Sequence, residues 1–190
     1  MTPAVLLLVL CCAQVVGAGG WQRITAPPEL ELPRDHGAHP DTRTEWWYAT
    51  AVVSDGEGRR WGIQLTFFRQ GLDPGPPTPG ASRLRADQVL AAHLTVVPAG
   101  GRVRHAQRLG RVGALADCAE GDLDVVLGDW RMRRGPDGSL ELEAWARESD
   151  LHLELRLDPV AALVAHGEGG MSRKGPEPGN ASVYLSYPRM

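Results

Sequence analysis

The chain has 190 residues and a formal net charge of −3, with 43% hydrophobic and 23% charged residues. This ordinary globular composition excludes collagen, coiled coil and wholesale disorder. The near balance of 20 basic and 23 acidic residues leaves no basic field to hold a phosphate backbone, so nucleic acid is not expected as a partner. The 23 glycines and 15 prolines favour short strands joined by turns over a helical bundle.

The N-terminus resembles a secretory leader. Residues 4–13 form an apolar run that fits the core of a signal peptide and falls short of the roughly 20 residues that a membrane span needs. Small residues at 16–18 (VGA) suit signal peptidase, so we expect removal of residues 1–18 and export. The first residues lack Lys and Arg, and Cys11 and Cys12 leave open an uncleaved or lipid-modified anchor.

A single domain is expected after this leader. Residues 19–43 show no sustained period and predict an irregular lead-in to a domain over 44–190. Short strands with β-type alternation are then predicted at 45–53, 61–69, 88–97, 102–111, 123–127, 130–134, 140–146 and 151–157. The turn at 55–58 joins the first two in a hairpin, and the Pro-rich stretch 71–80 indicates a rim loop or lid.

Strands of this number and spacing predict an antiparallel meander. Closure into a barrel removes exposed edges and leaves an interior that can hold one small ligand, so we expect an all-β, lipocalin-like antiparallel barrel. A two-sheet sandwich is the structural alternative. Alternation turns these residues toward a core or calyx: Leu140, Leu142, Leu151, Leu153, Leu155, Leu157, Trp61, Ile63, Leu65 and Phe67.

Polar and aromatic residues gather in four segments. These are 33–40 (PRDHGAHP), 45–48 (EWWY), 67–69 (FFR) and 166–175 (HGEGGMSRKG), with SYPR at 186–189. In these motifs, the chain from about Leu32 onward resembles the N-terminal half of the carotenoid 1,2-hydratase family, also called hydroxyneurosporene synthase or the CrtC/AttH-like secreted proteins.

The resemblance implies two consecutive lipocalin-like barrels that bind or act on isoprenoid or lipid chains. It also implies export or membrane association, and some members are labelled secreted hydrolases. The sequence stops at Met190, about where the second barrel would begin. The chain is then either a fragment, whose partner domain would be that barrel, or a reduced paralogue. Any catalysis by the first barrel could therefore require the second.

Hydration of a terminal alkene needs a proton donor, aromatic faces that stabilise a carbocation, and a base that activates water. Glu45 beside Trp46, Trp47 and Tyr48 offers such an acid, because a carboxyl in apolar surroundings has a raised pKa. Strand alternation places Trp47 on the same face as Glu45. The alternative is a structural ion pair between Glu45 and Arg69 across the hairpin.

Asp35 and His36 are further catalytic candidates. His36 and His39, with Asp35 and Asp41 beside them, have a spacing that suits zinc, and folding could add Glu45 and His166. The simpler interpretation is a turn held by hydrogen bonds to the backbone. We expect neither a metal nor a cofactor.

The leading function is an exported protein that binds an isoprenoid or lipid chain and contributes to cofactor-free hydration of a terminal C=C. The expected ligand-binding residues are Trp46, Trp47, Tyr48, Trp61, Phe67, Arg69, His166 and Lys174. A non-catalytic lipid-binding module is the alternative, and peripheral membrane contact is left open. A small-molecule hydrolase is a third reading, weakened because the chain has no Gly-x-Ser-x-Gly. The glycines at 167–170 instead indicate tight left-handed turns.

Overall fold

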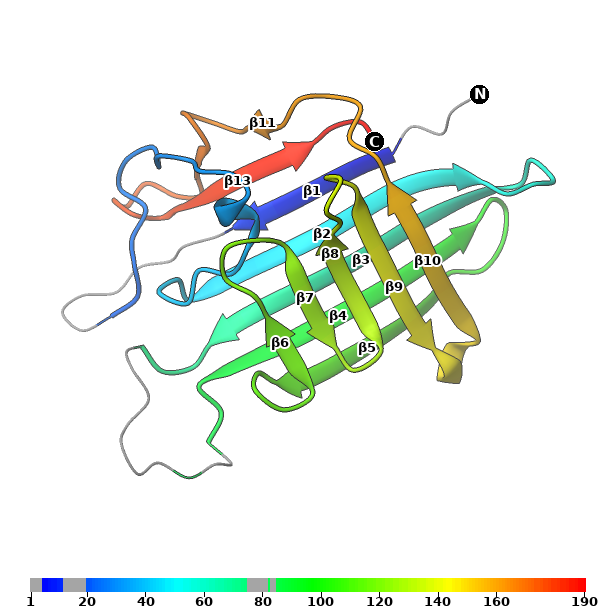
Figure 1. The fold of residues 1–190 in the computed structure, drawn as a ribbon, viewed down its shortest axis with the longest axis horizontal. Coiled ribbons are helices and arrows are strands. Elements are labelled where there is room, and N and C mark those ends of the chain that lie inside the picture. Colours follow the sequence, from blue (N-terminus) through cyan, green and yellow to red (C-terminus); the bar gives the residue numbers. More distant parts are fainter. Residues whose placement is uncertain (1–4, 12–19, 75–81, 83–84) are drawn as a thin grey trace.

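The computed structural model consists of two antiparallel sheets, and the small sheet lies across one face of the large one (Figure 1). It describes residues 5–11, 20–74, 82 and 85–190, with only the backbone given for 5–11. The large sheet contains β1 (Val5–Cys11), β2 (Thr44–Ser54), β3 (Arg60–Gly71), β4 (Gln88–Pro98), β5 (Arg104–Arg111), β11 (Val164–Ala165), β12 (Met171–Arg173) and β13 (Ala181–Tyr187). The small sheet contains β6 (Ala116–Cys118), β7 (Asp124–Leu127), β8 (Trp130–Arg134), β9 (Leu140–Ala146) and β10 (Leu151–Leu157). Two 3-10 turns complete the elements, η1 (Arg34–His36) and η2 (Arg147–Ser149).

The strand order explains how the chain builds these sheets. In the large sheet it is β11-β13-β1-β2-β3-β4-β5, with β12 paired to β13, and in the small sheet it is β10-β9-β8-β7-β6. All eight predicted strands are present, with small shifts at their ends. The sequence pattern does not predict strands β6, β11, β12 and β13. Three of them are very short, and β13 follows a glycine-rich loop. Residues 75–81 of the predicted rim loop lie outside the described residues.

The all-β prediction is confirmed, but the predicted closed barrel is not. Hydrogen bonding among the described strands gives two separate sheets, which agrees with the sandwich alternative. After β5 the chain turns at 112–115, where Gly113 has a φ of 81°. It then enters β6, which pairs with β7 and leaves β5 at the sheet edge. Alternation along a strand does not reveal this choice of partner.

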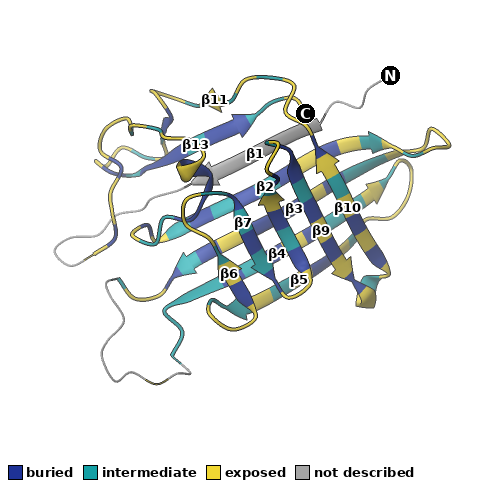
Figure 2. Ribbon diagram, viewed as in Figure 1, coloured by how far each residue is buried: buried dark blue, intermediate teal, exposed yellow. Residues whose placement is uncertain are grey.

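Among the described residues, the side chains between the two sheets form a packed core. The predicted inward residues face it: eight of the ten are buried, while Leu155 and Trp61 are partly buried and pack against the same cluster. Leu65, Phe67, Leu90, Leu94 and Trp130 have no exposed surface at all, so they border no cavity able to hold water. Figure 2 shows this buried layer along the facing strands. An apolar ligand could enter here only by displacing well-packed side chains.

The N-terminal strand coincides with the predicted leader. The backbone of β1 pairs with β13 on one side and β2 on the other. Residues 1–4 and 12–18 of the leader lie outside the described part of the chain. Across the described residues, no helix is long and apolar enough to cross a membrane.

Candidate functional site

The irregular lead-in returns across one end of the core and brings the first motif onto β2. The indole Nε1 of Trp47 donates a hydrogen bond of 3.0 Å to the carbonyl of His36. The backbone N–H of Ala38 donates to the carbonyl of Ala119 at 2.8 Å. A Cβ on Gly37 would lie 2.6 Å from the backbone nitrogen of Gly121, so this close approach requires glycine. The lead-in is thus fixed to both sheets.

Glu45 and Arg69 form a fully buried ion pair. They face each other in the β2–β3 register, and Arg69 Nε lies 2.5 Å from Glu45 Oε2, with both side chains 0% exposed. The structural pairing predicted for these residues is therefore confirmed. Buried charges need further hydrogen bonds to offset their desolvation.

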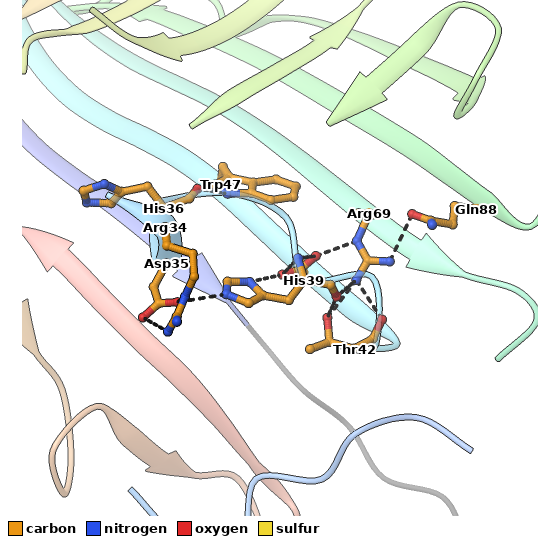
Figure 3. Close-up of polar contacts among 9 residues, drawn as sticks. Arg34, Asp35, His36, His39, Thr42, Trp47, Arg69 and Gln88 are labelled. Atoms are coloured by element: carbon orange, nitrogen blue, oxygen red, sulfur yellow. Dashed lines mark hydrogen bonds and ion pairs between the residues drawn. The ribbon is translucent and has the colours of Figure 1, made fainter. Parts of the chain in front are cut away.

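Arg69 obtains those bonds mainly from the loop before β2. Its Nη2 donates to the carbonyls of His39 and Thr42 at 2.8 and 2.7 Å and to Thr42 Oγ1 at 2.7 Å. Its Nη1 donates to Gln88 Oε1 on β4 at 3.2 Å. Figure 3 shows the guanidinium at the centre of these contacts. The buried arginine therefore fixes the loop to the sheet.

Glu45 in turn positions His39. The backbone N–H of His39 donates to both carboxylate oxygens, at 2.9 and 3.0 Å, and its Nδ1 lies 2.8 Å from Oε1. On the other side of the ring, Nε2 lies 3.4 Å from Asp35 Oδ1. His39 thus bridges two carboxylates, both of which accept hydrogen bonds (Figure 3).

This setting changes the pKa of His39 and that of Asp35. Burial opposes the charged form of His39, but hydrogen bonds and charges of Glu45 and Asp35 outweigh it and raise the pKa of His39. Burial also opposes ionisation of Asp35, but hydrogen bonds from Arg34, the Glu31 backbone and His39 outweigh it and lower the pKa of Asp35. Both shifts keep the shared proton on the imidazole.

His36 lies in a different environment from His39. Its Nε2 is 3.1 Å from the hydroxyl of Tyr187, and its Nδ1 is buried with no hydrogen-bond partner. Burial is the main cause that lowers the pKa of His36, and Asp122 and Arg134 act on it in opposite directions. His36 is therefore held neutral in the core.

A cleft of about 270 Å³ opens beside His39. Its lining residues are Gln22, Ile24, Pro28, Glu29, Leu30, Arg34, Asp35, His39, Thr42 and Val183. Ile24, Leu30 and Val183 belong to a small apolar cluster separate from the main core. The side chain of His39 is 29% exposed, whereas that of Glu45 is 0% exposed. Of these two residues, His39 and not Glu45 is therefore the one that a ligand in the cleft could touch.

The other predicted site residues are divided between three places. Trp47 and Phe67 face the core, and Trp61, half-buried, donates from its Nε1 to Asp55 at 3.1 Å. Trp46 and Tyr48 lie on the opposite face of β2, where they pack with Tyr184.

His166 and Lys174 belong to this opposite face as well. The ring of His166 stacks on Tyr184 with 4.0 Å between centroids, and its Nε2 lies 2.7 Å from Ser186 Oγ. Lys174 Nζ lies 5.7 Å from the centroid of the Tyr184 ring. The loop between them makes the predicted left-handed turns, at Gly167, Gly169 and Gly170. The structure therefore does not bring His166 and Lys174 to Glu45.

Among the described residues, no group of three or more His, Cys, Asp and Glu side chains is arranged to hold a metal ion. His36 and His39 point to different partners, Tyr187 and Glu45. The turn held by hydrogen bonds, our alternative for this loop, is what the structure contains.

Sequence reasoning considered His39 only as a metal ligand and gave no role to the apolar cleft residues. The position of His39, six residues before Glu45, could have indicated their contact. A loop that leads into a strand can fold back so that one of its side chains touches a residue at the start of that strand. Ile24 and Leu30 lie in a segment without period, and Val183 lies in an unpredicted strand. Periodicity offered no way to bring them together.

Comparisons with known proteins agree with this fold. A Nitrosomonas europaea protein described as an AttH, known from its crystal structure, is 36% identical to this chain and superposes with a TM-score of 0.75. The match covers 87% of this chain and 49% of that one, so this chain spans about half the length of that protein. No curated protein matches the chain significantly. The AttH-like family profile matches residues 23–190, and the chain therefore belongs to the AttH-like family.

Proposed function

We propose that the protein binds the end of an isoprenoid or lipid chain in the cleft beside His39. The observation that carries this proposal is the composition of the cleft, which joins an apolar wall of Ile24, Leu30 and Val183 to a polar side with His39 and Arg34. Ligand pockets commonly combine an apolar lining with a few polar groups that fix orientation.

The size of the cleft limits what it can hold. Its volume of about 270 Å³ lies below the roughly 300 to 1,000 Å³ of pockets that enclose a drug-sized ligand. A chain would therefore place one end in the cleft and leave the rest outside. The filled core between the sheets argues against entry of the chain there.

The polar end of the ligand would meet His39. The 3.4 Å between its Nε2 and Asp35 is long for a hydrogen bond, so an incoming acceptor can compete for that N–H. A carboxylate, hydroxyl or phosphate end would each supply such an acceptor.

Calorimetric titration with a long-chain fatty acid and a prenyl alcohol tests this proposal. We expect binding at about 1 to 100 µM for wild type and at least about tenfold weaker binding for Leu30→Gln, because the substitution places an amide in the apolar wall. Leu115→Gln is the matched control, since Leu115 is 73% exposed and not part of the cleft. Equal affinities of the two variants, or no wild-type binding below about 1 mM, would contradict the proposal.

Cofactor-free hydration of a terminal C=C is a second candidate, favoured by the access of His39 to the cleft. Protonation of an alkene requires a strong acid, and a raised pKa makes the His39 imidazolium a weaker one. Binding is thus better supported than hydration. Product analysis with an acyclic polyene should give a tertiary alcohol that His39→Gln abolishes while chain binding persists. No alcohol from wild type would exclude the second candidate for this chain.

Export is the remaining part of the proposal and rests on the leader-like residues 1–18. Their removal would take away β1, so β13 would have to pair with β2 or leave the sheet. The mature protein should begin at Gly19, as N-terminal sequencing of the exported fraction would determine. Recovery of Met1 from a soluble cytoplasmic pool would contradict export.

A further inference from the structure

The side of β2, β3, β4 and β5 turned away from the small sheet, here called the outer face, has an unusual composition. Its side chains form four central cross-strand rows: Trp46, Phe68, Ala91 and Leu109; Tyr48, Thr66, His93 and Gln107; Thr50, Gln64, Thr95 and His105; and Val52, Gly62 and Val97. Two end rows complete the face: Thr44, Gln70, Val89 and Arg111 before the first of these rows, and Ser54 and Arg60 after the fourth. None of these residues is acidic, in a chain with 23 Asp and Glu. Depletion of charge marks the centre of protein interfaces.

The outer face also exposes large apolar side chains. Phe68 is 39% exposed, Leu109 73%, Val52 41% and Val97 36%. Apolar groups gathered on one face of a soluble protein mark an interaction surface. The small sheet shows the opposite character, since its outer side carries Arg131, Arg133, Glu141, Glu143, Glu154 and Arg156.

The rows differ in height in a way that suits self-association. The first row carries the ring of Phe68, which is 39% exposed and lies edge-on to His93 with 5.8 Å between centroids. The fourth row contains Gly62, which has no side chain, and lies in a hollow of about 290 Å³. Its lining includes Val52, Trp61, Val97 and the charged Arg60. The two rows between them are mostly polar and uncharged.

We propose that the outer face is the contact surface of a homodimer. A two-fold axis that runs across the strands between the second and third rows lays the first row of one copy over the fourth row of the other. Phe68 then fits over the partner's Gly62, and Thr66 meets the partner's Gln64 as a hydrogen-bonding neighbour. Each row meets a complementary row, as an isologous contact requires.

The area of the face is sufficient for such a dimer. At about 3.3 Å per residue and about 4.8 Å between strands, β2 to β5 cover roughly 35 by 19 Å, or about 700 Å² per copy. The total of about 1,400 Å² falls within the usual range for stable interfaces. An anionic membrane is less well matched, because the whole face carries only two arginines, Arg60 and Arg111, besides His93 and His105, and membrane-binding faces are rich in Lys and Arg.

Sedimentation velocity of the full chain from about 1 to about 200 µM tests the proposal. We expect a dimer in this range, and at least a 100-fold larger dissociation constant, roughly, for Phe68→Glu, Leu109→Glu and Gly62→Trp. Trp145→Glu is the matched control, because Trp145 is also an aromatic residue 39% exposed but lies on the small sheet. Its dissociation constant should equal that of wild type.

Circular dichroism and urea unfolding establish that each variant is folded before its association is compared. A wild-type chain that stays monomeric throughout the range overturns the proposal. So does an equal effect of Phe68→Glu and Trp145→Glu. Binding of the monomer to vesicles of anionic phospholipid, without dimer formation, overturns it in favour of a membrane surface.

Discussion

Two ion pairs in this protein have the same chemistry and the same contact distance but opposite surroundings. Glu45 faces Arg69 across β2 and β3, and Glu141 faces Arg133 across β8 and β9. The closest nitrogen–oxygen distance is 2.5 Å in both pairs. The side chains of the first pair are 0% exposed, whereas those of Arg133 and Glu141 are 48% and 32% exposed. The two pairs therefore differ in burial and in the further hydrogen bonds that the buried pair makes.

Burial determines what each ion pair contributes to stability. An exposed pair gains little stability, because water solvates both partners when they separate. A buried pair must offset the desolvation of two charges, and apolar residues of similar volume would often serve stability equally well. An apolar pair could not hold His39, which makes three hydrogen bonds to Glu45. We therefore interpret the buried pair as a positioning device for the cleft.

The largest expected effect comes from breaking the buried pair. Glu45→Gln or Arg69→Met should each lower the free energy of unfolding by about 3 to 5 kcal/mol, because the remaining partner stays buried and uncompensated. The double variant should lose less than the sum of the two. A double-mutant cycle in urea measures this coupling. A coupling near zero would show that the pair does not act as a unit.

Removal of one supporting hydrogen bond should have a smaller effect. Thr42→Val deletes an acceptor for Arg69 while nearly preserving shape, and Thr42 is only 2% exposed. We expect a loss of about 1 to 2 kcal/mol in urea unfolding. Thr44→Val is the control, since its hydroxyl donates to Gln70 in a half-buried position. A larger loss for Thr44→Val would contradict the importance of the arginine contacts.

The contributions of the two loop histidines, His39 and His36, to stability should change with pH in opposite directions. His39 has a raised folded-state pKa, so its contribution is present below the unfolded pKa of about 6.5 and is lost as pH rises through the folded pKa. His36 has a lowered pKa, so its contribution is present above about 6.5 and is lost as pH falls.

Urea unfolding of His39→Gln and His36→Gln across this pH range measures both contributions. The destabilisation by His39→Gln should decrease with rising pH, and that by His36→Gln should increase. Slopes of the same sign would contradict the assignment of His39 to the charged bridge and His36 to the neutral core.

The comparison of the two pairs also shows how far sequence reasoning reaches. The Glu45–Arg69 pair was predictable, because one turn at 55–58 fixes the hairpin register and alternation puts both residues on one face. The cleft was not, because Leu30 and Val183 are far apart in the chain and lie outside any predicted strand. The two-sheet arrangement depends on the turn at 112–115, and turn geometry at a single connection leaves no periodic signal.

The smallest effect is expected for the exposed pair, and it tests the comparison most directly. Arg133→Gln and Glu141→Gln should each change the free energy of unfolding by no more than about 1 kcal/mol, with a coupling of about 0.2 to 1 kcal/mol. Because both side chains reach solvent, added salt should reduce that coupling, whereas the coupling of Glu45 with Arg69 should stay nearly constant. Double-mutant cycles at about 0.05 and about 1 M NaCl would compare the two pairs. If the exposed pair coupled as strongly as the buried one, or if both responded equally to salt, burial could not be the property that separates them, and the role of Glu45 in positioning His39 would lose its energetic basis.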